Sequence, residues 1–449
     1  MKTAGFRGFG SFMVAESIED MVARACRGER VAKLPFASSA LSRESTGVKV
    51  SPLKRTSHED FALDLAEFTF VNHGAFGAAL RAGSRRAREW REYAEEQPLR
   101  YFDRDLFPGL VESARRLASF IGARPDQLAL TNNATAGLDA VIASAFAASD
   151  KCNDRILIFD TTYGSVKKMA ARHFGSDHVD ELHLPLPLRD QDHFLYELEA
   201  QLDSMDLTNT RLAVVDHVTS NTAVCLPIEE MSKLFQARGI PTLVDGAHGP
   251  WATALDLEAL SCDYYVGNCH KWLCAPKSVG FVFVRSPDEH TASLAPRITS
   301  HGEQSPFPGC FFWDGCRDYA AALALPAVLD YWYEHDAILA RSQAVSLVQE
   351  ARAMLEKRWA TENLGLAAMG SEFTEIPMTC VGLPVNLEHG SSADAHGLQE
   401  RLYHTHKVEC PVKEINGRLY LRISSHVYNC LDDYERVAHA VDDVLRDVV

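Results

Sequence analysis

Short apolar runs alternate with segments of helical periodicity from residue 61 to residue 284 of the chain. This alternation is typical of βαβ units, in which amphipathic helices connect buried parallel strands. It predicts helices that begin near residues 135 and 165, and a further helix over 228–238. It predicts strands over 128–131, 155–159, 211–215, 241–244, 263–266 and 279–284. We therefore expect one large α/β domain whose sheet is mainly parallel and sandwiched by helices.

The pattern changes after residue 315. Residues 315–358 have the spacing of two long helices, with no strand between them. The remaining C-terminal residues predict strands over 379–386, 408–413 and 418–424 and helices over 393–404 and 431–448. These elements indicate a smaller α+β domain. The predicted organisation is a large domain over 58–325 and a small domain over 326–449.

The first 57 residues differ from the rest in charge and composition. They hold ten Lys and Arg against five Asp and Glu, a net charge of +5, whereas the whole chain has a net charge of −16. A Gly- and Phe-rich opening and a Ser-, Arg- and Lys-rich stretch over 38–57 predict a flexible tail and linker around a short amphipathic helix over 13–26. An organelle presequence is the alternative, although the acids at Glu16, Glu19 and Asp20 are unusual in one.

Composition excludes several classes of function. Hydrophobic residues make up 46% and charged residues 24% of the 449 residues, as in soluble globular proteins. No apolar run approaches the roughly 18 residues that span a bilayer, so no membrane partner is expected. The net negative charge argues against nucleic acid as a partner. Eleven cysteines with no CxxC pair indicate neither a disulfide framework nor a zinc site, so we expect no metal and a reducing compartment, the cytoplasm by default.

Three groups of polar residues follow predicted strands, at the edge where open α/β sheets bind their ligands. Residues 131–135, Thr-Asn-Asn-Ala-Thr, lead a strand into a helix and could cradle a phosphate, although an ordinary helix cap uses the same residues. Asp245 ends a second strand, where a helix cap is the simpler interpretation, and Lys271 follows a third. A phosphate clamp, a carboxylate for a ring nitrogen and an amine for a carbonyl are together what pyridoxal 5'-phosphate requires. The combination therefore predicts this cofactor.

Seven segments resemble one known family in chain order. They are residues 70–77 (FVNHGAFG), 131–135 (TNNAT), 216–220 (DHVTS), 244–248 (VDGAH), 264–272 (YYVGNCHKW), 313–318 (WDGCRD) and 421–429 (LRISSHVYN). Together they look like the class V aminotransferase family of fold-type-I pyridoxal phosphate enzymes, in the branch of isopenicillin N epimerases, plant-type L-cysteine desulfhydrases and hercynylcysteine sulfoxide lyases. The likeness extends from residue 61 to the end. It implies a seven-stranded sheet in the large domain and a homodimer with shared active sites.

The resemblance also implies roles for single residues. Lys271 would bind the cofactor covalently and move the Cα proton, and Asp245 would pair with the ring nitrogen. His248 and Ser220 would lie near the phenolic oxygen, and Arg422 and Asn72 would receive the substrate carboxylate. The residues implied to hold the phosphate or the ring are Ala134, Thr135, Asn268, His270 and Tyr163. Structural roles stay open for three of these: an outward ion pair for Arg422, core packing for Tyr163 and a satisfied core position for His270.

Two cysteines depart from the family pattern. Cys316 stands where a threonine usually contacts the phosphate of the neighbouring subunit, and a thiol is a weaker donor than a hydroxyl. Cys410 lies about where cysteine desulfurases carry a nucleophile on a mobile Gly-rich loop, but its neighbours predict a packed strand in which a thiol is inert.

The sequence predicts an enzyme that acts at Cα of a small L-amino acid. C–S lysis of cysteine or a cysteine conjugate is the favoured reaction, with pyruvate and ammonia as products. Epimerisation is the main alternative; a cysteine desulfurase and a non-catalytic scaffold are further ones. Motifs for a serine hydrolase, a P-loop and a zinc deaminase are absent from the sequence.

Overall fold

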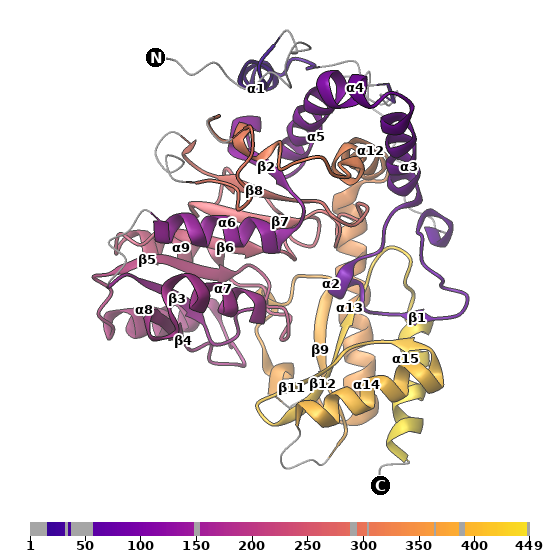
Figure 1. The fold of residues 1–449 in the computed structure, drawn as a ribbon. Helices are drawn as coiled ribbons and strands as arrows, with labels where there is room; N and C mark the ends of the chain where they lie inside the picture. Colours follow the sequence, from indigo (N-terminus) through magenta and orange to yellow (C-terminus); the bar gives the residue numbers. More distant parts are fainter. Residues whose placement is uncertain are drawn as a thin grey trace.

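The computed structural model describes residues 16–31, 35–36, 57–147, 153–287, 294–302, 305–362, 365–385 and 391–446. Its centre is a seven-stranded sheet in the order β2-β8-β7-β6-β5-β3-β4 (Figure 1). Strands β7, β6, β5, β3 and β4 are parallel, and β8 runs antiparallel to both β2 and β7. The strands are β2 (Leu128–Thr131), β3 (Arg155–Phe159), β4 (Val179–Leu182), β5 (Thr210–Asp216), β6 (Thr242–Gly246), β7 (Tyr264–Asn268) and β8 (Gly280–Val284). The predicted fold class is confirmed.

Helices cover both faces of this sheet, which explains why its strands read as nearly continuous apolar runs. One face packs against α6 (Ala134–Ala147) and α7 (Gly164–Phe174). The other face packs against α5 (Leu106–Phe120), α8 (Gln191–Asp203), α9 (Ile228–Gln236) and α12 (Leu325–Glu334). Strand β4 was missed from the sequence because it lies at the edge of the sheet and only Leu182 of its four residues is buried. Because the other residues are at least partly exposed, the sequence of β4 lacks the apolar run that marks the buried strands.

A smaller sheet and two helices form the lower part of the molecule in Figure 1. The sheet is antiparallel in the order β11-β12-β9. Its elements are β9 (Met378–Gly382), β11 (Val412–Ile415), β12 (Arg418–Ser424), α14 (Ser392–His406) and α15 (Leu431–Arg446). The single strand predicted over 408–413 is wrong: β10 (Val408–Glu409) and β11 are separate strands. They separate because Pro411 has no N–H and because β10 pairs with a different strand.

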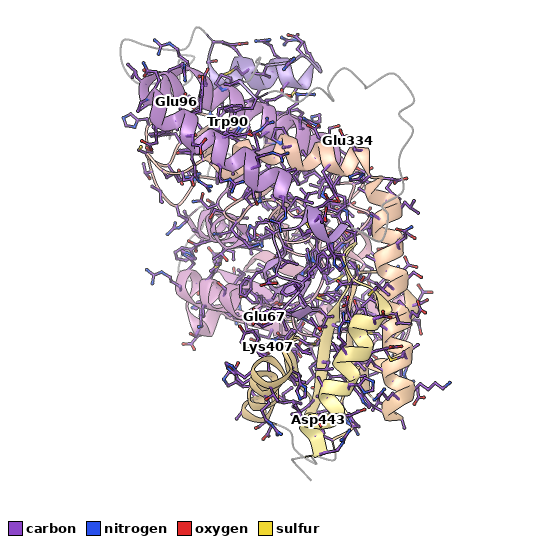
Figure 2. All side chains as sticks on the ribbon, turned by 90° about the vertical axis from the view of Figure 1, so that its right-hand side faces the viewer. Glu67, Trp90, Glu96, Glu334, Lys407 and Asp443 are labelled. Atoms are coloured by element: carbon purple, nitrogen blue, oxygen red, sulfur yellow. The ribbon has the colours of Figure 1, made fainter. Side chains whose placement is uncertain are left out.

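Two elements connect the upper and lower parts. Helix α13 (Ala337–Trp359) contributes Ala340 and Ala344 to the large core and Val348 and Leu355 to the small one. Strand β1 (Thr69–Phe70) precedes the large sheet in the sequence but pairs in parallel with β10 of the lower part. Beside this pair, Glu67 and Lys407 lie 3.9 Å apart, and Figure 2 shows them at the junction. Residues 69–71 therefore pack with the C-terminal unit although they precede the large sheet in the sequence.

The N-terminal region contributes a packed helix. Helix α1 (Ile18–Cys26) begins after Ser17, whose hydroxyl accepts the N–H of Asp20. Its buried face, formed by Ile18, Met21, Val22 and Ala25, joins the core beside α5. This is the amphipathic helix expected over 13–26; it begins later than expected, and its buried apolar face packs it against the large domain. Residues 1–15 and 37–56, including most of the predicted linker, lie outside the described residues.

The remaining helices line the upper part of the molecule and the connection to β1. They are α2 (His73–Phe76), α3 (Arg81–Glu96), α4 (Pro98–Arg100) and α11 (Ala320–Leu323). The two long helices predicted over 315–358 are α12 and α13, with α11 as a short turn before them. Among the residues that the structure describes, no helix has the length and apolar character needed to cross a membrane.

Candidate active site

The carboxyl ends of three neighbouring strands bring polar side chains to one edge of the large sheet. Asp216 ends β5, Asp245 lies near the end of β6, and Asn268 ends β7. Asp216 and Asp245 are register partners, and Lys271 follows β7 by three residues. This is the edge at which parallel α/β sheets bind ligands. Two of the groups that the sequence singled out, Asp245 and Lys271, therefore lie close enough to interact.

Lys271 is buried at this edge, and burial lowers the pKa of its amine to about 8. The charge of Arg422 lowers it further, whereas Asp245 and Asp216 raise it. A lysine with an ordinary pKa near 10.5 would be almost entirely protonated at neutral pH. The amine of Lys271 is instead partly neutral there, which is the form that reacts with a carbonyl.

His248 fixes the position of this amine. Its Nε2 lies 3.3 Å from Nζ of Lys271, and its Nδ1 accepts the indole N–H of Trp272 at 3.1 Å. An indole nitrogen only donates, so Nδ1 must be unprotonated and a neutral His248 carries its proton on Nε2. Burial and the nearby Lys271 hold the pKa of His248 well below its ordinary value. The imidazole therefore presents an N–H to the lysine amine.

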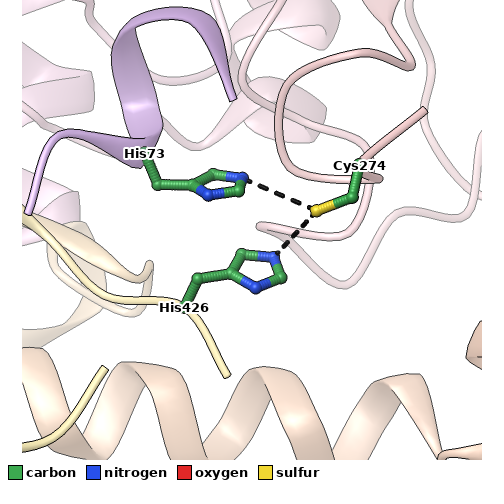
Figure 3. A group of neighbouring side chains, drawn as sticks. All are labelled: His73, Cys274 and His426. Atoms are coloured by element: carbon green, nitrogen blue, oxygen red, sulfur yellow. Dashed lines mark hydrogen bonds between the residues drawn. The ribbon is translucent and has the colours of Figure 1, made fainter. Parts of the chain in front are cut away.

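A second group of buried side chains holds the main chain of Lys271 and Trp272. Figure 3 shows these three side chains, His73, Cys274 and His426, and their contacts with one another. Nε2 of His73 lies 3.2 Å from the carbonyl oxygen of Lys271, and Nε2 of His426 lies 3.2 Å from that of Trp272. The thiol of Cys274 donates to the same Trp272 oxygen at 3.3 Å. Burial lowers the pKa of both imidazoles, so both are neutral. We call His73, Cys274 and His426 the backbone clamp. Sequence reasoning missed it, because its members are 152 to 353 residues apart.

The backbone clamp also has the residue types of a metal site, since its three ligand-type atoms lie within 4.8 Å of one another. The geometry of the rings favours hydrogen bonding instead. The imidazoles of His73 and His426 stack with centroids 4.1 Å apart and planes inclined by 20°. Both Nε2 atoms also lie within hydrogen-bonding distance of Sγ of Cys274, at 3.7 Å from His73 and 3.5 Å from His426 (Figure 3). Each Nε2 faces a carbonyl oxygen, which an imidazole N–H satisfies.

The predicted phosphate cradle lies at the N-terminus of α6. The N–H of Ala134 donates to Oδ1 of Asn268 at 2.8 Å, and the N–H of Ala136 donates to Asn133. Thr135 is exposed at this helix end. His270 uses Nδ1 to bind the carbonyl of Val279 at 2.9 Å, and burial lowers its pKa to about 4. Its Nε2 is then an acceptor, so His270 would donate to a phosphate oxygen only in its protonated form.

Arg422 approaches the site from β12 of the small sheet. It is buried, and its guanidinium donates to the carbonyl of Ser220 and to Oδ1 of Asn72, the latter at 3.3 Å. Asn72 in turn donates to Glu409 at 3.1 Å. In the described part of the chain Arg422 forms no ion pair with an acid, so the alternative of an outward surface ion pair is wrong. A buried guanidinium that contacts only neutral acceptors is suited to an external carboxylate.

The other predicted residues differ in exposure. Tyr163 precedes α7 and is 50% exposed, so core packing does not account for it. Cys316 is exposed on the loop before α11. Cys410 is fully buried between β10 and β11, and burial raises the pKa of its thiol. A buried neutral thiol is a poor nucleophile.

The residues present fit pyridoxal phosphate. Asp245 keeps one oxygen on the N–H of Ala247 at 3.0 Å, and its other oxygen remains for a ring nitrogen. The partly neutral amine of Lys271 and the helix N-terminus at Ala134 supply the other two contacts that the cofactor requires.

Comparisons with known proteins agree with this arrangement. A probable chloroplastic L-cysteine desulfhydrase of Arabidopsis thaliana is 31% identical over 417 residues, which cover 87% of this chain and 85% of that protein. The isopenicillin N epimerase of Amycolatopsis lactamdurans is 30% identical, over 77% of this chain and 88% of that protein.

Solved structures show the same fold at lower identity. The cystine C–S lyase C-DES, in complex with its product cysteine persulfide, superposes with a TM-score of 0.67 at 20% identity and covers 84% of this chain and 98% of its own. The Escherichia coli cysteine desulfurase CsdA has a TM-score of 0.67 at 16% identity and covers 88% of this chain and 99% of its own. The profile of the family described as aminotransferase class-V matches residues 107–437. The chain therefore belongs to the class V aminotransferase family, and its cofactor is pyridoxal 5'-phosphate.

Proposed function

We propose that the protein is a C–S lyase that acts on L-cysteine or a cysteine S-conjugate and yields pyruvate, ammonia and a sulfide or thiol. The observation that carries the proposal is that the site holds two buried basic side chains that differ in protonation. Lys271 has a pKa lowered to about 8, so it can accept a proton, whereas Arg422 stays charged and has no acid partner among the described residues. One is suited to move the Cα proton, and the other to bind the α-carboxylate of the same substrate.

Pyridoxal phosphate, once bound, supplies an electron sink for the pair left when Cα loses its proton. The residues of this chain do the rest. Asp245 would hold the ring nitrogen, Tyr163 would lie on the ring, and His248 and Ser220 would bind near the phenolic oxygen. Ala134, Thr135, Asn268 and His270 would hold the phosphate. These roles are the ones that the family resemblance implies for these positions.

The substrate would be oriented by a chain of hydrogen bonds that begins in the small domain. Glu409 accepts from Asn72, and Asn72 accepts from Arg422. This chain fixes the guanidinium before substrate arrives, so less side-chain entropy is lost on binding. With the carboxylate on Arg422, Lys271 would remove the Cα proton. The Cβ–S bond then breaks, the sulfur leaves with the bonding pair, and water converts the released enamine to pyruvate and ammonia.

Elimination is favoured over epimerisation because it needs one proton carrier, and Lys271 is that carrier. An epimerase needs a second acid on the opposite side of Cα. Tyr163 is the one candidate we assign to the ring on that side, and a phenol is a weak acid. Relatives of both kinds exist: the Arabidopsis protein is named a desulfhydrase, and the Amycolatopsis protein is named an epimerase.

The deciding experiment incubates the enzyme with L-cysteine, cysteine S-conjugates and isopenicillin N in deuterated water. Pyruvate together with sulfide or thiol is the expected result. Deuterium at Cα with inverted configuration, and no pyruvate, would establish the epimerase instead. The Lys271→Ala variant is the control, since it should lose either reaction and the cofactor absorbance.

A homodimer with shared sites completes the proposal. Phe76 and Tyr163 are 77% and 50% exposed, although both belong to segments that border the site. Large exposed apolar side chains beside a functional site are typical of surfaces that another chain covers. Light scattering of the purified protein should give twice the 49.7 kDa mass of the chain. The Phe76→Asp variant should shift the mass toward the monomer.

The cytoplasm is the compartment we propose, with a plastid or mitochondrion as the alternative. Ten cysteines of the described residues are free thiols, which is usual in a reducing compartment. Removal of residues 1–57 as a presequence would also remove α1, and the core surface against which its Met21 and Val22 pack would become exposed. Fluorescence of a full-chain fusion, with and without residues 1–15, would distinguish these locations.

A further inference from the structure

Asp216 is a buried carboxyl group next to the site that the reaction above does not use. It pairs in register with Asp245 on the adjacent parallel strand, so the two Cα atoms are about 4.8 Å apart and the two side chains lie on the same face of the sheet. Both residues are buried, with 4% and 6% of their surface exposed. Two carboxyl groups so close together and shielded from water do not both ionise at neutral pH.

The surroundings of the two acids differ and decide which one holds the proton. Burial raises the pKa of Asp245, but the N–H of Ala247 and the field of Lys271 both stabilise its carboxylate and oppose that rise. Asp216 receives a hydrogen bond from the Thr162 hydroxyl, and Lys167 and Lys271 act on it more weakly. Asp160 directly follows β3, on the other side of β5, but its oxygens bind His183 and Leu184. Burial and the charge of Asp245 raise the pKa of Asp216 well above its ordinary value.

We propose that Asp216 is a positioning residue that remains a neutral carboxylic acid and donates its proton to Asp245. This inference rests on the role proposed above for Asp245 toward the ring nitrogen. The donated hydrogen bond keeps Asp245 ionised and fixes the carboxylate with its free oxygen toward the cofactor. Thr162 assists, because its Oγ1 accepts the N–H of Phe159 at 3.0 Å and therefore aims its own proton elsewhere, at Asp216.

The first test needs no variant. Infrared spectra of the wild-type holoenzyme in light and heavy water should show the carbonyl stretch of a protonated carboxylic acid at neutral pH, where exposed acids are ionised. The Asp216→Asn variant should lose this band. Absence of the band in the wild-type protein, or its persistence in Asp216→Asn, would overturn the proposal.

The second test asks whether the proton, and not the charge, supports the cofactor. Asn at position 216 keeps a donor of similar shape, so cofactor release from Asp216→Asn should stay within about twofold of wild type. Asp216→Ala removes the donor and should release the cofactor about five to ten times faster, the range for one hydrogen bond. Equal release from both variants, whether fast or slow, would contradict the proposal.

A matched control separates this effect from general damage to the sheet. Asp263 precedes β7 at the opposite end of the same strands, where it is buried and accepts the N–H of Thr242 at 2.8 Å. Asp263→Asn should change neither the infrared band nor cofactor release. All these readouts are independent of which amino acid is the substrate, so failure of the lyase proposal and failure of this one are distinguishable.

Discussion

Trp272 donates its indole N–H to Nδ1 of His248 at 3.1 Å, and this single contact decides the tautomer of the histidine that faces Lys271. Trp272, the residue directly after the reactive lysine, thus determines that the imidazole presents an N–H, and not a lone pair, to the lysine amine. Because Nε2 of His248 then carries the proton, a neutral amine can accept it at the observed 3.3 Å.

Replacing Trp272 with Phe should allow His248 to adopt either neutral tautomer. The variant keeps an aromatic ring but loses the donor, so kcat/KM should fall by about fivefold to tenfold, the effect of one hydrogen bond of about 1 kcal/mol. Steady-state kinetics of pyruvate release measure it. Trp332→Phe is the control, because Trp332 donates to the carbonyl of Leu273 at 2.9 Å and does not touch His248. An equal loss in both variants would mean that packing alone is responsible.

The amine of Lys271 should react with a pH midpoint near 8. Capture of pyridoxal phosphate by cofactor-free protein requires the neutral amine, so its rate should rise with pH through the lowered pKa of about 8. Stopped-flow absorbance follows the reaction. Asp245 raises the pKa of Lys271, so Asp245→Asn should move the midpoint to lower pH. A midpoint near 10.5 in the wild-type protein would show that burial does not act on this amine.

Arg422→Lys should keep the charge but lose the planar fork that binds a carboxylate at two points. We expect kcat/KM to fall by about 1.5 to 3 kcal/mol, the range for a hydrogen bond to a charged group. The absorbance of the bound cofactor should not change. Unchanged kinetics would return Arg422 to a structural role, in which it only links Ser220 and Asn72.

The backbone clamp should make the protein sensitive to acid. His426 is neutral in the folded state, where burial lowers its pKa to about 3, and it regains an ordinary pKa near 6.5 on unfolding. A group with a lowered folded pKa stabilises the protein above the unfolded value, and this stability is lost as pH falls below about 6.5. Melting temperatures between pH 8 and pH 5 should therefore decrease.

The His426→Phe variant tests the source of this acid sensitivity. It keeps a ring to stack on Trp251, which lies 4.2 Å from His426 between centroids, but it has nothing to protonate. Its melting temperature should depend less on pH than that of the wild-type protein. It should also be lower at pH 8, because the carbonyl of Trp272 loses a donor. A pH dependence identical to wild type would place the acid sensitivity elsewhere.

Cys410→Ala should still release sulfur. The thiol is buried, its pKa is raised by burial, and Sγ lies 3.8 Å from the carbonyl of Arg422. Turnover should stay within about twofold, while the melting temperature falls because a buried side chain is shortened. Cys380→Ala, at the other buried thiol whose pKa responds to Arg422, is the comparison. Loss of sulfur release with normal cofactor binding in Cys410→Ala would identify a desulfurase.

The sequence by itself determined the buried strands of the large sheet and the three groups at their ends. A buried strand needs apolar residues on both faces, so β3, β5 and β8 appear as runs in the sequence. Asp245 follows such a run directly and Lys271 follows one by three residues, and a polar residue near the end of a buried strand is a local signal. The family motifs extended that signal to Arg422, on a strand far along the chain.

Tertiary structure decided the contacts between distant segments. His73, Cys274 and His426 converge on two carbonyl groups, and no spacing in the sequence marks them. The burial that lowers the pKa of Lys271 and raises that of Asp216 also comes from packing. β4 and the break at Pro411 escaped prediction because an edge strand needs few apolar residues and because strand pairing depends on the partner. Local sequence places a side chain on a strand, whereas its charge state depends on every segment that excludes water from it.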